Sequence, residues 1–412
     1  TIMLRGVARV SARGITGVRY NSSTAANPTY DVVIVGGGSA GISLLNNWMK
    51  HSTASVDQSG DKFSFAIVEP SSKHYYQPLW TLVGGGVVSN AADSEGDTKD
   101  LIPKRAKWFQ DKVVAIDPNK NEVNLEKGEK IGYKALVVAA GLQVNFDKIK
   151  GLPEALEDPN SPVCSNYSYK YCQKTATAVQ NFTGGDAYFT FPTGPVKCAG
   201  APQKIMYLAH DAWKKKNLSP NIYFNSAIGK MFAVDKYREA LDKLCDEKGI
   251  VRNFGHNLVE VKADEKKAVF QLVPDIVGKD REGETVTVDF DFLHATPLMG
   301  PPDFLKETGL VDASGFVSVK KETLQHTEFP NVFSFGDCSN VPTSKTASAV
   351  AGQLGVVRYR AGKYLGSQES ATPKTADFAN FVEGDGPVYD GYSSCPLPVG
   401  QSKGIIAEFN FD

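Results

Sequence analysis

Short runs of almost entirely apolar residues recur along the chain, and most of them end in glycine or lead into a helical pattern. In the first part of the chain these runs lie at residues 30–35, 63–68 and 135–140. A second group comprises residues 187–191, a helical pattern at 203–213, and residues 222–224. Strands that are apolar throughout are typical of parallel sheets covered by helices on both faces. The pattern therefore predicts an α/β protein with two βαβ units.

The remaining strand patterns assign further segments to these units. Residues 111–116 and 122–125 alternate around a turn at Asp117-Pro118-Asn119, which predicts an antiparallel hairpin. A strand near residues 258–261 is expected to be the third of the second unit, and residues 332–335 are expected to complete the first sheet.

A glycine-rich loop follows the first strand, in the sequence Gly36-Gly37-Gly38-Ser39-Ala40-Gly41. Gly36 permits a tight turn, Gly38 lets a pyrophosphate approach the backbone, and Gly41 allows close packing of helix on strand. The amides of Ser39 and Ala40 are expected to point at phosphate. A strand before the loop and a helix after it make this pattern indicative of a dinucleotide site.

Other residues are predicted to complete a flavin adenine dinucleotide (FAD) site. Glu69 ends the second strand, where a carboxylate can accept the ribose hydroxyls of an adenosine. The aromatic segment 74–80, which contains Gln77, is expected to line the cofactor. Val113 and Gly141 are candidate nucleotide contacts, with core packing as the alternative. The late segment is expected to contribute four more contacts: Gly336, Asp337, Lys345 and Thr346.

The loop of the second unit lacks the features of a phosphate cradle. Pro192, Pro195 and Pro202 lie in it, and proline removes amide donors and stiffens the backbone. The next strand ends in Asn225-Ser226, without the acid or arginine that would hold a ribose. The second fold is therefore expected to have lost NAD(P) binding, and the electrons must come from another donor.

Cys198 lies in this second loop, just before a helix. The helix N-terminus and the neighbouring Lys197 and Lys204 favour its thiolate, which is the form that attacks sulfur. Cys395 lies in a stiff segment next to Pro396. The spacing alone leaves the pairing of these two cysteines open. The other four are expected to be small buried residues: Cys164, Cys172, Cys245 and Cys338.

Composition excludes several classes of protein. A net charge of -1 argues against nucleic-acid binding, and no apolar run reaches the length of a membrane-spanning helix. There is no C-x-x-C motif and no histidine at ligand spacing from a cysteine, so no metal site is expected. The first residues are rich in arginine and lack acids before Asp31, as in mitochondrial presequences.

These observations predict two tandem Rossmann-like folds of the FAD/NAD(P)-binding, glutathione-reductase-like type, the second no longer NAD-binding. The predicted division places a presequence-like segment at 1–28, the FAD-binding domain at 29–160 and 291–370, the second Rossmann-like domain with Cys198 at 161–290, and a C-terminal segment with Cys395 at 371–412.

Three motifs then resemble one family: Pro195 to Lys204 around Cys198, Gly336-Asp337 with residues 342–346, and residues 389–397 around Cys395. From about residue 30 to 411 the chain closely resembles the mitochondrial sulfide:quinone oxidoreductases. The resemblance implies FAD, a disulfide or sulfur-bridged pair formed by Cys198 and Cys395, hydrogen sulfide as substrate, and ubiquinone as electron acceptor.

By the same resemblance, Cys198 is the flavin-side thiolate and Cys395 carries sulfane sulfur to glutathione or sulfite. Lys345 would place positive charge beside the flavin, with a solvated surface lysine as the alternative. The family implies peripheral association with the matrix side of the mitochondrial inner membrane, although its members continue past this C-terminus with amphipathic helices. Two alternatives stay open: a flavocytochrome-type sulfide dehydrogenase, and a non-enzymatic flavoprotein that senses sulfide.

Overall fold

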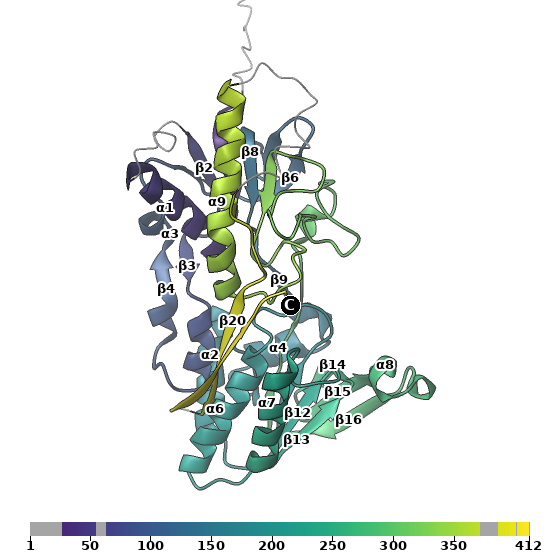
Figure 1. Cartoon of the computed structure of the whole chain (residues 1–412). Helices are drawn as coiled ribbons and strands as arrows, with labels where there is room; N and C mark the ends of the chain where they lie inside the picture. Colours follow the sequence, from purple (N-terminus) through teal and green to yellow (C-terminus); the bar gives the residue numbers. More distant parts are fainter. Residues whose placement is uncertain (1–26, 55–62, 371–385, 401, 412) are drawn as a thin grey trace, which may run out of the picture.

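The computed structural model describes residues 27–54, 63–370, 386–400 and 402–411. Almost all of the predicted presequence lies outside these residues. The described chain forms two α/β units, one above the other in Figure 1, with a C-terminal hairpin that crosses between them. Among the described residues, no helix combines the length and the apolar character needed to cross a bilayer.

The first unit is a seven-stranded sheet with the order β5-β2-β1-β8-β7-β6, in which β19 also pairs with β8. Its strands are β1 Thr29–Val35, β2 Phe65–Val68, β5 Lys107–Phe109, β6 Val113–Asp117, β7 Glu122–Leu125, β8 Lys130–Val138 and β19 Val332–Ser334. The central strands pair in parallel, whereas β6 and β7 form the predicted antiparallel hairpin. The late strand β19 returns to this sheet, as the sequence predicts.

Two long helices pack against each other on this first unit. They are α1 Ser39–Ala54, which follows the glycine loop, and α9 Ala347–Ser370, which runs along the sheet in Figure 1. Because helices and loops cover both faces, the inner strands carry fully buried apolar side chains such as Val33, Ile34 and Leu136.

The second unit is a parallel sheet with the order β10-β17-β11-β12-β13. Its strands are β10 Val163–Cys164, β11 Asp186–Phe191, β12 Asn221–Ser226, β13 Ile250–Phe254 and β17 Phe292–His294, and its helices are α5 Tyr169–Asn181, α6 Ala201–Lys215 and α7 Asp235–Lys248. The predicted strand-helix-strand order of β11, α6 and β12 is confirmed. Since β17 pairs with β11, this sheet extends past the predicted domain boundary at residue 290.

The third parallel strand is β13, so its predicted place at residues 258–261 is wrong. Those residues belong to β14 His256–Lys262, which pairs with β15 Lys267–Leu272 and β16 Thr285–Asp289 in a separate antiparallel sheet. Gly255, at φ +72°, turns the chain out of the parallel sheet. A short apolar run predicts a strand but does not reveal which sheet it joins.

The C-terminal hairpin joins the two units. Its strands are β20 Ser393–Gly400 and β21 Lys403–Phe409, and β20 contacts both α6 and α9 (Figure 1). The remaining elements are short: β3 Lys73–Tyr75, α2 Pro78–Gly84, η1 Ala91–Ser94, β4 Glu95–Asp97, α3 Thr98–Leu101, β9 Gln143–Asn145, η2 Phe146–Lys148, α4 Leu152–Glu157, α8 Pro274–Val277, η3 Lys279–Arg281, β18 Leu298–Gly300 and η4 Asp303–Leu305.

Candidate functional site

The glycine loop between β1 and α1 has the geometry of a phosphate-binding turn. Gly36 adopts φ +102°, and a Cβ there would lie 2.5 Å from the carbonyl oxygen of Ala139. A Cβ at Gly41 would lie 1.9 Å from the carbonyl oxygen of Gly36, whereas a Cβ at Gly38 would meet no atom within 4 Å. Gly36 and Gly41 are thus required by packing, whereas the space beside the backbone at Gly38 is open, as a bound pyrophosphate would need.

Glu69 lies directly beside this loop, at the end of β2. Its Oε2 accepts a hydrogen bond from the amide of Gly37 at 2.8 Å, and its Oε1 accepts one from the amide of Ser71 at 2.8 Å. The carboxylate is therefore held in place by backbone donors, and its remaining lone pairs suit a ribose hydroxyl.

Gly141 and Val113, the two other predicted nucleotide contacts, differ in whether open space lies beside them. Gly141 adopts φ +70° and has open space where a Cβ would stand, as expected of a close approach between backbone and ligand. Val113 is partly buried and packs against the core of the first unit. The core-packing alternative therefore accounts for Val113, and its contact with a nucleotide stays a prediction.

The segment after β19 brings several charged groups together. Burial raises the pKa of the Asp337 carboxyl, and the nearby ammonium groups of Lys197 and Lys345 oppose this rise. Lys345 donates to the carbonyl of Ser339 at 2.6 Å and lies over the Phe316 ring, 4.8 Å from its centroid. The alternative of a solvated surface lysine does not describe this environment.

The residues on either side of this segment also make defined contacts. Gly336 adopts φ +72°. The hydroxyl of Thr346 lies 2.9 Å from that of Ser393 in the C-terminal hairpin. Gln77, at the start of α2, accepts a hydrogen bond from Nζ of Lys197 at 3.2 Å. Of the predicted cofactor contacts, Gln77 and Lys345 therefore touch the loop that carries Cys198.

The structure brings Cys198 and Cys395 into contact, with their Sγ atoms 3.6 Å apart. Cys198 adopts φ +51°, a left-handed conformation that is unusual for a residue with a side chain. Its amide donates to the carbonyl of Lys345 at 2.8 Å, which holds the cysteine loop against the segment after β19. Cys395 lies in β20 and is 3% exposed.

Gly200, which the sequence reasoning did not single out, permits this contact. A Cβ at position 200 would lie 2.6 Å from Sγ of Cys395. The sequence offered one signal for this role, a glycine two residues after a reactive cysteine. Only the position of β20 shows why no side chain can be accommodated at position 200. The other four cysteines are buried, as expected: Cys164, Cys172, Cys245 and Cys338.

The two sulfurs differ in their electrostatic surroundings. A hydrogen bond from Cys395 lowers the pKa of Cys198, and the charge of Lys204 lowers it further against the effect of burial. Nζ of Lys204 lies 3.2 Å from Sγ of Cys198. The pKa of Cys395 is raised, because its thiol donates to the Cys198 thiolate and is also buried. The proton therefore resides on Cys395 and the negative charge on Cys198.

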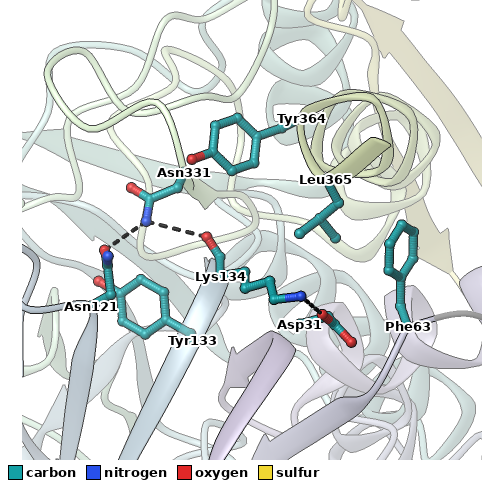
Figure 2. Close-up of a pocket in the computed structure, with 8 residues that line it drawn as sticks. All are labelled: Asp31, Phe63, Asn121, Tyr133, Lys134, Asn331, Tyr364 and Leu365. Carbon is teal, nitrogen blue, oxygen red and sulfur yellow. Dashed lines mark hydrogen bonds and ion pairs between the residues drawn. The ribbon is translucent and has the colours of Figure 1, made fainter. Parts of the chain in front are cut away.

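A separate cavity of about 380 Å³ lies near the beginning of the central strands β1 and β8, whereas the glycine loop follows the end of β1 (Figure 2). Asp31 and Lys134 form an ion pair of 2.7 Å at its wall, and Asn331 donates to Asn121 at 2.7 Å. None of the predicted site residues lines it. Within the described residues, no cluster of histidine, cysteine or acidic side chains is arranged to hold a metal ion.

Comparisons with known proteins agree with this architecture. A family model for pyridine nucleotide-disulphide oxidoreductases matches residues 30–177. The mouse protein named mitochondrial sulfide:quinone oxidoreductase is 42% identical over 384 residues, which cover 93% of this chain and 78% of that protein. A protein of the same name from Dictyostelium discoideum is 43% identical over 389 residues, with coverages of 92% and 77%.

The solved structure of the sulfide:quinone oxidoreductase from Aquifex aeolicus superimposes with a TM-score of 0.67 at 16% identity, covering 93% of this chain and 87% of that one. At that identity the match shows the fold alone. It confirms the predicted α/β fold class, while the loss of NAD binding by the second unit stays a prediction.

Proposed function

We propose that this chain, which belongs to the mitochondrial sulfide:quinone oxidoreductase family, oxidises hydrogen sulfide at Cys198 and Cys395 and passes two electrons to ubiquinone. One observation carries the proposal: two sulfurs 3.6 Å apart, one of them next to a lysine ammonium, at the junction of both units and the C-terminal hairpin. A pair of adjacent thiols with unequal pKa values is suited to thiol–disulfide exchange.

In the oxidised enzyme the two cysteines form a disulfide. Hydrosulfide attacks Sγ of Cys395, the bond between the two Sγ atoms breaks, and its electron pair leaves on Cys198 as a thiolate. Cys395 then carries a persulfide. Lys204 stabilises the leaving thiolate, because its ammonium already lies 3.2 Å from Sγ of Cys198.

A small acceptor, glutathione or sulfite, takes the sulfane sulfur from Cys395 and leaves a thiol there. Restoring the disulfide removes two electrons and the thiol proton from the pair. FAD, when bound, supplies the two-electron acceptor for this step and the route to the quinone.

The residues around the first loop fit FAD. Gly36, Gly38, Ser39, Ala40 and Gly41 would hold its pyrophosphate, since the loop opens a helix and faces open space at Gly38. Glu69 would bind the adenosine ribose, and Gly336 and Asp337 the ribitol or pyrophosphate region. Lys345, at the junction with the cysteine loop, would supply positive charge for the anionic reduced flavin.

The proposed location is the matrix side of the mitochondrial inner membrane, with peripheral attachment. Two observations support it: the relatives are named mitochondrial proteins, and the first thirty residues contain four arginines and no acidic residue.

The deciding experiment is anaerobic addition of sulfide to the purified holoenzyme while the visible absorbance of the flavin is recorded. Bleaching that reverses on addition of a short-chain quinone is the expected result. Reoxidation by a c-type cytochrome but not by quinone would favour the flavocytochrome-type alternative. A flavin that sulfide leaves oxidised would favour the non-enzymatic sensor and contradict the proposal.

A further inference from the structure

The chain at the start of helix α9 contacts both segments that carry a reactive sulfur. On one side, the carbonyl of Lys345 accepts a hydrogen bond from the amide of Cys198 at 2.8 Å. On the other side, β20, which carries Cys395, lies against α9 (Figure 1). Because the two cysteines come from distant parts of the chain, a third segment that contacts both of them can set the distance between their sulfurs.

The contact with β20 consists of three hydrogen bonds to the two residues before Cys395. The hydroxyl of Ser348 accepts a hydrogen bond from the amide of Ser394 at 2.8 Å and another from its hydroxyl at 2.9 Å. The hydroxyl of Thr346 lies 2.9 Å from that of Ser393, which is fully buried. Since Ser394 directly precedes Cys395, these bonds fix the backbone from which the Cys395 side chain projects.

The start of α9 is itself held in place. The Thr346 hydroxyl accepts a hydrogen bond from the amide of Ala349 at 3.1 Å, which caps the helix. One turn beyond Ser348, a Cβ at Gly352 would lie 3.1 Å from the ring of Tyr389. The chain that enters the C-terminal hairpin therefore packs directly on α9, and the helix is a fixed support for it.

We propose that Ser348 is a positioning residue for the cysteine pair. Its hydroxyl fastens β20 to the start of α9, while the Lys345 carbonyl fastens Cys198 to the same segment. In the reduced protein no covalent bond joins the two sulfurs, so the fraction of molecules in which they touch depends on this shared support. No proton, electron or covalent bond is transferred to Ser348.

Two properties of the pair depend on that contact. One is formation of the disulfide, and this part of the proposal rests on the proposed function. The other is the hydrogen bond from the Cys395 thiol to the Cys198 thiolate, whose sulfurs lie 3.6 Å apart, and this part does not rest on it. Loss of the Ser348 hydroxyl should weaken both, because both require the same arrangement of the two sulfurs.

Ser348→Ala tests the proposal, with Tyr237→Phe as the matched control. The hydroxyl of Tyr237 donates to the carbonyl of Glu408 and accepts from its amide, both at 3.1 Å. Glu408 lies in β21, directly opposite Ser394. Each variant therefore removes one hydroxyl that bonds the backbone of the same hairpin, but only Ser348→Ala does so beside a sulfur.

The first measurement is the stability of the disulfide. Holoenzyme is equilibrated anaerobically with mixtures of reduced and oxidised dithiothreitol, and mass spectrometry of the acid-quenched, alkylated peptides gives the fraction of the Cys198–Cys395 disulfide. Reduced dithiothreitol converts the disulfide to the dithiol and becomes its own cyclic disulfide. In Ser348→Ala, the ratio of reduced to oxidised dithiothreitol at half-reduction should fall about threefold to tenfold, the range expected for one lost hydrogen bond.

The second measurement is the rate at which iodoacetamide alkylates Cys198 in reduced holoenzyme across a range of pH. The midpoint should rise by about half a pH unit in Ser348→Ala, since the Cys395 thiol donates to the thiolate in fewer molecules. The other titratable groups that interact with Cys198 are unchanged in every variant: Lys204, Asp337 and Tyr167.

Two further variants separate positioning from general stability. Ser348→Thr keeps the hydroxyl and should restore both midpoints. Ser394→Ala keeps the amide bond to Ser348 and loses only the hydroxyl bond, so its shifts should lie between those of the parent protein and Ser348→Ala. Tyr237→Phe should lower the melting temperature but leave both midpoints in place.

Unchanged midpoints in Ser348→Ala overturn the proposal. Equal shifts in Ser348→Ala and Tyr237→Phe also overturn it, because any attachment of the hairpin would then position Cys395. If the parent protein forms no Cys198–Cys395 disulfide at any dithiothreitol ratio, the proposed function fails, while the alkylation midpoints still decide whether Ser348 positions the two sulfurs.

Discussion

The loops after β1 and β11 occupy the same position in their two folds but differ in their residues and in the contacts of their backbone amides. In the first loop, the amides of Gly36 and Gly37 donate to Val68 and Glu69 at its start. In the first loop, the backbone at Gly38 faces open space. In the second, the amide of Thr193 donates to Asn257, that of Lys197 to Met299, and that of Cys198 to Lys345. Phosphate binding requires amides without protein acceptors. These contacts support the prediction that the second loop no longer binds a phosphate and instead positions Cys198.

Both loops nevertheless use the same property of a helix. The N-terminus of a helix favours negative charge, whether it is carried by a phosphate or by a thiolate. Before α1 that charge would be a pyrophosphate; before α6 it is the Cys198 thiolate, with Lys204 of the first helical turn beside it. Duplicated folds can thus diverge in chemistry while keeping the electrostatics of the strand-loop-helix unit.

The largest expected effect comes from removing either sulfur of the Cys198–Cys395 pair. Cys198→Ser and Cys395→Ser should each lower sulfide-dependent quinone reduction by about a thousandfold or more, since each sulfur is a reacting atom. Cys395→Ser should keep a long-wavelength charge-transfer band with oxidised FAD, because the Cys198 thiolate remains, whereas Cys198→Ser should lose it. Absorbance spectra and turnover check both statements.

Cys245→Ala, which removes a buried thiol outside the pair, is the control and should turn over normally. A band that persists in Cys198→Ser and vanishes in Cys395→Ser would show that the roles of the two sulfurs are reversed. Turnover at the parent rate in either serine variant would rule out the two-cysteine mechanism.

The next effect tests whether the second loop has kept any nucleotide binding. NADH should reduce the flavin at least about a hundredfold more slowly than sulfide does, because the amides of Thr193, Lys197 and Cys198 already donate to protein acceptors and the loop's prolines donate none. Anaerobic stopped-flow mixing of the holoenzyme with each reductant gives the two rates directly. Equal rates would show that a nicotinamide site survives, and the contrast between the loops would fail.

The contrast between the loops was partly predictable from sequence. The glycines after β1 and the prolines after β11 are local signals, so the strand-loop-helix order around each loop could be predicted without knowledge of any contact. The pairing of Cys198 with Cys395 was not predictable from the residues, because they are 197 positions apart and only the family resemblance joined them. The role of Gly200 depends on where β20 lies, which no local pattern encodes.

The strands show the same difference between what local sequence predicts and what depends on long-range contacts. Apolar runs identified β1, β8, β11, β12 and β19, since those strands are buried on both faces. The third parallel strand was misplaced because β13 has several partly exposed residues, whereas β14, in the next sheet, contains the buried Leu258 and Val261. Burial pattern predicts that a segment is a strand, but its partners depend on long-range packing.

A smaller effect is expected from weakening the first loop. Glu69→Ala removes the acceptor for the amides of Gly37 and Ser71 and the proposed ribose ligand. FAD affinity should fall by about 1 to 3 kcal/mol, the usual cost of losing a hydrogen bond to a charged group. Fluorescence titration of apoprotein with FAD measures it, with Glu129→Ala, at an exposed turn, as control. Unchanged FAD affinity in Glu69→Ala would refute the ribose assignment.

The smallest effect separates the lysine from the helix N-terminus in the second loop. The pKa of Cys198 lies below its ordinary value, so the thiolate is present at neutral pH and is lost as the pH falls through that lowered pKa. Lys204→Met removes the ammonium but keeps the helix, and should raise the midpoint of Cys198 alkylation by about one unit, or about 1.4 kcal/mol. Turnover below that midpoint should fall about tenfold. Lys214→Met, at an exposed position on the same helix, should leave the midpoint in place. A midpoint that Lys204→Met does not move would assign the low pKa to the helix N-terminus and the Cys395 thiol, and the two loops would then share their electrostatics without help from any lysine.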